Sequence, residues 1–64
     1  MDKSGIGEEI RTRRLLLHIT QSQLAEALGV TRGTVSNWER GSAMPRATVE
    51  RIHETIRQLA QVRR

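Results

Sequence analysis

The stretch from Thr20 to Gly41, TQSQLAEALGVTRGTVSNWERG, places the strongest constraint on how this chain can fold. Thr20 followed three residues later by Gln23 forms a capping box, which marks the start of a helix. Gly29 stands where that helix should stop, because glycine adopts the left-handed conformation of a helix end without steric cost. Thr31 can then cap a second helix that runs to Gly41. The stretch therefore predicts two short helices joined by a tight turn, over residues 20–41.

The two predicted helices each have an apolar face. Leu24, Ala25 and Leu28 lie on one face of the first helix, which we expect to be buried. On the second helix, at about 100° per residue, Val35 and Trp38 lie nearly opposite the polar residues. Those polar residues share one arc: Arg32, Gly33, Ser36, Asn37 and Arg40. One side of the second helix is thus expected in a core and the other side in contact with a partner or solvent.

The residue types in the polar arc are those that read DNA. Asparagine can pair with N6 and N7 of adenine, and arginine with O6 and N7 of guanine, in the major groove. The alternative is an ordinary solvated helix face. The capped preceding helix, the glycine in the turn and the basic charge balance favour a DNA reader. We predict base contacts from four residues: Arg32, Gly33, Ser36 and Asn37.

The same stretch resembles the lambda-repressor-like (Cro/repressor) helix-turn-helix family, whose pattern is close to T-Q-x-x-L-A-x-x-L-G-V-S/T-x-x-x-I/V-S-x-W/I-E-x-G. The matching residues are Thr20, Gln21, Leu24, Ala25, Leu28, Gly29, Val30, Thr31, Val35, Ser36, Trp38, Glu39 and Gly41. With its flanking helices the resemblance covers nearly the whole chain. It implies an all-α bundle of four or five helices, with the helix after Thr31 docked in the major groove.

Contacts to the DNA backbone are expected on both sides of the base readers, because such contacts fix the register of the protein on the duplex. Gln21 lies in the first turn of its helix, where backbone N–H groups also favour a phosphate. The resemblance supports this role and implies a second set of contacts to the DNA backbone around the loop 41–45. The predicted backbone contacts are Gln21, Thr31, Arg40, Ser42 and Arg46. Arg40 could instead complement the helix dipole.

The segment before Thr20 carries an arginine on an apolar stripe. Ile6, Ile10, Arg14 and Leu17 follow helical spacing. The resemblance implies that Arg14 forms an internal ion pair with Glu39; the alternative is two unrelated surface charges.

This region also departs from the family pattern. A run of three leucines, 15–17, requires one or two of them to face outward or to meet a neighbour. His18 replaces the glycine common at this helix end, and we expect a structural role there.

Gly33 is a third departure, because relatives usually project a base-reading side chain from this position. Its lack of a side chain can allow close approach of the backbone or of Arg32 to the groove, or it can reflect a base pair that is not read.

The chain from Pro45 onward predicts one continuous helix, with Pro45 as its first residue. Apolar residues and a terminal arginine recur at helical spacing: Val49, Ile52, Ile56, Leu59 and Arg63. Val49, Ile52 and Ile56 are expected to close the core. Leu59 and Val62 extend beyond what a small bundle can cover, so we predict that they contact a second copy; the alternative is a frayed end.

Composition agrees with one small DNA-binding domain, 1–64, preceded by a loose tail at 1–4. Eleven Lys and Arg against seven Asp and Glu give a net charge of +4, and ten of the eleven are arginine, which suits bidentate contact with phosphate and guanine. The absence of cysteine excludes a disulfide framework and a Cys-based metal site. With no long apolar run and no signal pattern, we expect a soluble, cytoplasmic protein of a bacterial or phage-infected cell and no membrane contact.

No motif for catalysis, a metal or a cofactor is present in the sequence. Glu50, His53 and Glu54 share one helical turn, but solvation is a better explanation than metal binding. We therefore predict no enzyme, and nothing in these residues for a ligand-sensing domain. The predicted function is a sequence-specific transcriptional regulator, a small repressor of the phage Cro or bacterial type, bound as a homodimer to a near-palindromic operator in double-stranded DNA. An antitoxin with a toxin partner and a pure protein adaptor are the alternatives.

Overall fold

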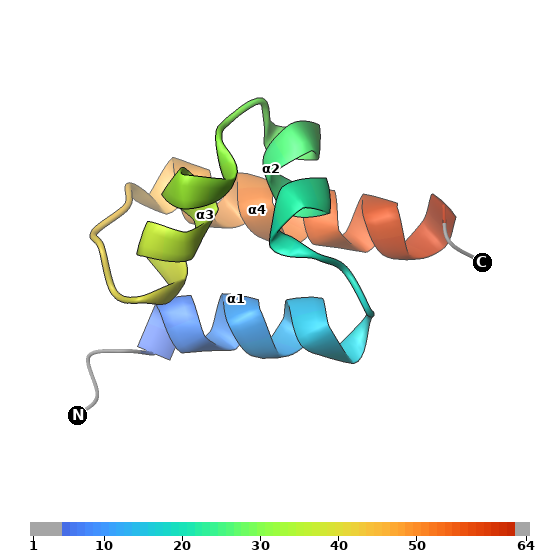
Figure 1. Cartoon of the computed structure of the whole chain (residues 1–64). Helices are drawn as coiled ribbons and strands as arrows, with labels where there is room; N and C mark the ends of the chain where they lie inside the picture. The colour runs from blue at the N-terminus through green and yellow to red at the C-terminus, as the bar shows by residue number, and fades with distance from the viewer. Residues whose placement is uncertain (1–4, 63–64) are drawn as a thin grey trace.

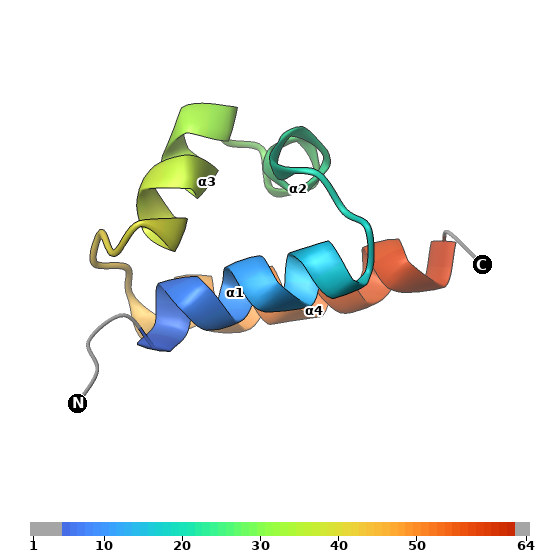
Figure 2. The same ribbon diagram turned by 60° about the horizontal axis from the view of Figure 1, so that its bottom comes forward.

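The computed structural model describes residues 5–62 as four helices: α1 (Gly5–Leu16), α2 (Gln21–Leu28), α3 (Arg32–Glu39) and α4 (Arg46–Val62). Helices α1 and α4 run in the same direction on one side of the molecule, and α2 and α3 lie on the other side (Figure 1, Figure 2). The all-α fold and the uninterrupted α4 confirm the sequence prediction. The tail expected at 1–4 and the side chains of the last three residues lie outside what the structure describes.

One core joins all four helices. Its buried apolar residues are Ile10, Ile19, Leu24, Ala25, Leu28, Val35, Ile52 and Ile56. Burial of each large side chain contributes about 1.5–3 kcal/mol, which makes this core the main source of stability. Val49, expected in the core, is only half-buried, and Thr55 is buried although no apolar pattern predicted it.

The capping predictions for α2 are confirmed in detail. The Thr20 hydroxyl accepts a hydrogen bond from the Gln23 backbone N–H at 3.0 Å, and the Thr20 N–H donates to Gln23 Oε1 at 2.8 Å. At the other end Gly29 has a φ of 79°. The N–H of Val30 donates to the carbonyl of Ala25 at 3.0 Å, which closes a Schellman motif. These local bonds fix where α2 begins and ends.

Helix α1 ends in the same motif with a histidine in the glycine position. His18 has a φ of 59°, and the Ile19 N–H donates to the Arg14 carbonyl at 2.9 Å. The structural role expected for His18 is therefore played by its backbone, which adopts the left-handed conformation that ends α1. Its consequence is that Ile19, the next residue, turns into the core, where it is 2% exposed.

Two details of the predicted helices are wrong. Ile6 and Leu17, placed on the inner stripe of α1, are 48% and 37% exposed; Leu17 leaves the stripe because α1 ends one residue earlier. Leu15 and Leu16 are also exposed, so the whole leucine run faces outward. Pro45 precedes α4 instead of beginning it: its carbonyl accepts the first helical bond, from Val49 at 3.1 Å, which is the geometry of a capping residue.

Candidate nucleic-acid interface

Helix α3 is anchored by its apolar face. Val35 is fully buried, and Trp38 is half-buried against the core. Thr31 caps the helix: its backbone is extended and its hydroxyl accepts from the Thr34 N–H at 3.2 Å. The polar arc faces outward as a result. Arg32, Gly33, Asn37 and Arg40 are exposed, and Ser36 is half-buried.

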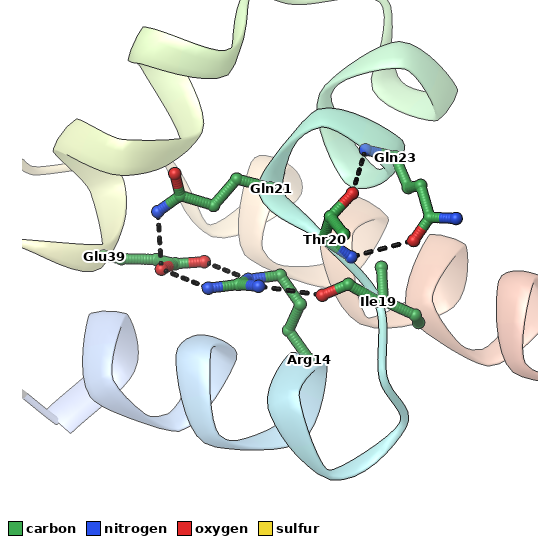
Figure 3. Close-up of polar contacts among 6 residues, drawn as sticks. All are labelled: Arg14, Ile19, Thr20, Gln21, Gln23 and Glu39. Carbon is green, nitrogen blue, oxygen red and sulfur yellow. Dashed lines mark hydrogen bonds and ion pairs between the residues drawn. The ribbon is translucent and has the colours of Figure 1, made fainter.

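A buried ion pair holds the far end of α3 against α1 (Figure 3). Arg14 Nε donates to Glu39 Oε2 at 2.7 Å and Nη2 donates to Oε1 at 3.1 Å, with side-chain exposures of 7% and 3%. Arg14 Nη1 also donates to the carbonyl of Ile19 at 2.8 Å. The guanidinium is thus satisfied on several sides, as a buried charge requires. Removing one partner of such a pair costs about 3–5 kcal/mol, so it fixes the position of α3.

Gln21 has a role inside the protein that sequence reasoning did not anticipate. Its Nε2 donates to Glu39 Oε1 at 3.1 Å, which links the start of α2 to the end of α3 (Figure 3). The Thr31 hydroxyl is likewise engaged in the cap and lies 3.0 Å from the Thr34 hydroxyl. For both residues, the side chain assigned to DNA backbone contact already has a partner in the protein.

The starts of α2 and α3 are suited to an anion. Neither first turn carries an acidic residue, whereas α1 has Glu8 there. Arg32 is the first residue of α3, at the positive end of the helix dipole, so its positive charge is unfavourable for the isolated helix. Arg32 and Gln21 border one open surface hollow that also includes Thr20. A positive charge beside the first turns of two helices that carry no acidic residue favours a bound phosphate.

The remaining predicted backbone contacts lie at the other end of α3. Gly41 has a φ of 118°, and the Ser42 N–H donates to the Asn37 carbonyl at 3.0 Å, so α3 also ends in a Schellman motif. Ser42 and Arg46 are exposed on the loop and at the first turn of α4. Arg40 Nη2 donates to Asn37 Oδ1 at 3.3 Å, a contact between two predicted DNA-binding residues.

Two residues that position the site were missed from the sequence. Gly7 is buried in α1, and a Cβ there would lie 2.5 Å from the Trp38 carbonyl oxygen. Because Gly7 has no side chain, α1 can closely approach the end of α3. Arg51 of α4 donates from Nη2 to the Leu28 carbonyl at 3.1 Å and so satisfies the end of α2. For Gly7, the available signal in the sequence was a glycine inside a predicted helix. Nothing in the sequence indicated the contact of Arg51.

The predicted dimer residues lie on the last turns of α4. Leu59 is half-buried against the core of its own chain and shares a shallow hollow with Ala27 of α2. The expectation that the bundle could not cover Leu59 is therefore wrong in part, because α2 shields one side of it. Val62 is the last residue of α4, and its side chain is outside the described part of the structure.

The metal alternative has no geometry to support it in the described part of the chain. Glu54 forms an exposed ion pair with Arg57 at 2.7 Å, and His53 is half-buried. Among residues 5–62, no three His, Cys, Asp or Glu side chains are grouped as metal ligands. No helix in that range is both long and apolar enough to cross a membrane.

Comparison with known proteins agrees with this geometry. A family model described as "Helix-turn-helix" matches residues 10–49. The chain is 52% identical over 40 residues to the HTH-type transcriptional regulator DicA of Escherichia coli (strain K12); the match covers 62% of this chain and 30% of that protein. No solved structure matches the chain. The chain belongs to the Cro/repressor-type helix-turn-helix family, and this membership supports a DNA-binding transcriptional regulator.

Proposed function

We propose that residues 1–64 form one DNA-binding domain of a sequence-specific transcriptional regulator, with α3 in the major groove. One observation carries this proposal: Val35 and Trp38 face the core, while Arg32, Asn37 and Arg40 are exposed together on the opposite side of α3. The interior of a protein–protein interface tends to exclude charge, so this face favours DNA over a protein adaptor role.

The finer proposal is a repressor that binds a near-palindromic operator as a homodimer in the cytoplasm. Two copies related by a two-fold axis would read half-sites one helical turn apart, roughly 34–36 Å. Repression then follows from occupancy of the operator, with no chemistry at the site. The phosphate contacts that fix the register come from the backbone N–H of Gln21 at the start of α2, whose side chain is held by Glu39, and from Ser42 and Arg46 on either side of the loop after α3.

Selection of bound sequences from a random duplex library, at a stated salt concentration, tests the proposal. We expect a paired half-site with an adenine at the position that faces Asn37. Affinity for the selected duplex should fall by roughly 0.9 log unit per log unit of salt for each phosphate neutralised. Failure to enrich any sequence, together with an affinity that is independent of salt, would contradict a DNA-reading function. Recovery of a stoichiometric toxin protein would favour the antitoxin alternative over a simple repressor.

A further inference from the structure

Asn37 in the last turn of α3 and Arg40, the residue that caps this helix, have exposed side chains joined by a hydrogen bond. Arg40 Nη2 donates to Asn37 Oδ1 at 3.3 Å. An arginine side chain has only donors, so the end of the amide that faces Arg40 must be its oxygen. The amide nitrogen of Asn37 therefore points away from Arg40. The contact fixes which end of the amide is the donor and which is the acceptor.

The backbone beneath these side chains is held as well. The Asn37 carbonyl accepts from the N–H of Arg40 at 3.1 Å and from the N–H of Ser42 at 3.0 Å. Arg40 caps the helix with φ of −88° and ψ of −1°, and Gly41 follows it in the left-handed region. The turn after α3 thus sets where the Arg40 guanidinium begins and limits the directions it can reach.

Together the two side chains present three groups in a row: the amide N–H of Asn37, its oxygen, and the remaining N–H groups of Arg40. This is a donor–acceptor–donor pattern. In the major groove an A·T pair presents N7, the N6 amino group and O4, which is the complementary acceptor–donor–acceptor pattern. A G·C pair presents two acceptors followed by a donor, so at least one position would place like groups together.

We infer that Asn37 and Arg40 act as one unit that reads a whole A·T base pair, with Asn37 on adenine and Arg40 on O4 of the thymine. Arg40 is then both a positioning residue, through the Asn37 amide, and a specificity-determining residue. This inference rests on the proposed function. It replaces the simpler role for Arg40, a contact to phosphate that carries no sequence information.

The test compares the random-duplex selection for the full chain with that for Arg40→Ala, with Arg46→Ala as the matched control. Both substitutions remove one exposed arginine, which caps α3 in the first case and is the first residue of α4 in the second. Arg40→Ala should relax the preference for A·T at a single position by about tenfold, within the usual range for one good base contact. Arg46→Ala should weaken binding to all sequences about equally and leave that preference intact.

A base analogue separates the two contacts of the unit. In the selected duplex, the thymine opposite the adenine that faces Asn37 is replaced by 4-thiothymine, which keeps N3–H for pairing and carries sulfur, a weak acceptor, in place of O4. The full chain should bind this duplex several-fold more weakly, and Arg40→Ala should show little further loss on it. Asn37→Ala should lose the preference for adenine and should also reduce the effect of Arg40→Ala, because the two act together.

The outcomes distinguish this inference from the proposed function. If the full chain enriches a half-site but Arg40→Ala keeps the A·T preference and binds every duplex more weakly, Arg40 is a phosphate contact and the inference is wrong. An equal loss for Arg40→Ala on the thymine and 4-thiothymine duplexes would also overturn it. If the full chain enriches no sequence, the proposed function fails first. Circular dichroism of each variant checks that the helices are retained.

Discussion

At the scale of single residues, three successive helices end in the same Schellman motif with different residues in the left-handed position. Gly29 and Gly41 occupy it after α2 and α3, and His18 occupies it after α1. The left-handed conformation costs an L-residue with a Cβ roughly 1–2 kcal/mol, and glycine avoids this cost. The end of α1 is therefore less favourable than the other two, although its backbone hydrogen bonds are equivalent.

Replacement of His18 by glycine should raise the free energy of unfolding by about 0.5–1 kcal/mol, because the relief of strain exceeds the added freedom of the unfolded chain. Urea unfolding measures the change. The matched control is the reverse substitution at the equivalent position, Gly29→His, which should lower the free energy of unfolding by a similar or larger amount. A loss of stability in His18→Gly would mean that the imidazole itself supports the fold.

This scale also explains what the sequence could predict. The caps at Thr20, Gly29 and Thr31 were predictable because every partner lies within five residues in the chain. The Arg51 contact to the Leu28 carbonyl was not, because 23 residues separate the partners and only the packed fold brings them together. Arg40 and Asn37 have the spacing of neighbours on a helix surface. Their contact still could not be predicted, because the Arg40 guanidinium could equally bind a phosphate, complement the helix dipole or donate to the Asn37 amide.

At the scale of elements, the position of α3 depends on how closely α1 can approach it. A Cβ on Gly7 would lie 2.5 Å from the Trp38 carbonyl oxygen and 3.0 Å from that of Glu39, and both atoms are rigid backbone. The same end of α3 is held by the buried pair of Arg14 and Glu39. Apolar periodicity predicted both helices, yet it carries no information about the distance between them.

We expect Gly7→Ala to lower the free energy of unfolding by about 1–3 kcal/mol, the usual cost of forcing extra volume into a packed contact. The shift of α3 should also weaken binding to the selected duplex. Thermal and urea unfolding, with DNA affinity measured on the folded fraction, give the two readouts. Gly5→Ala is the control: it adds the same methyl group to the same helix in open space, so stability should be unchanged or slightly higher. Equal effects of the two substitutions would contradict the packing argument.

At the scale of the whole molecule, the last turns of α4 extend past the end of α1 (Figure 1, Figure 2). Leu59 is partly covered by its own chain, so it contributes less free surface than the sequence pattern predicted. The uninterrupted α4 itself was predictable, because no glycine or proline breaks the segment after Pro45. A contact between copies was inferred from the spacing of Leu59 and Val62, and it requires a test at the level of assembly.

If two copies meet through this end of α4, a charge at Val62 should separate them, because a carboxylate buried in an apolar contact loses its hydration without gaining a partner. Val62→Asp should then lose at least tenfold in affinity for a duplex with two half-sites and keep its affinity for a duplex with one. Gln61→Asp adds the same charge at an adjacent exposed position of α4 and should keep both affinities. Sedimentation of each protein with the two-site duplex gives the stoichiometry directly. Two Val62→Asp chains bound with unchanged affinity would place the contact between copies elsewhere, and the DNA-reading role proposed for α3 would be unaffected.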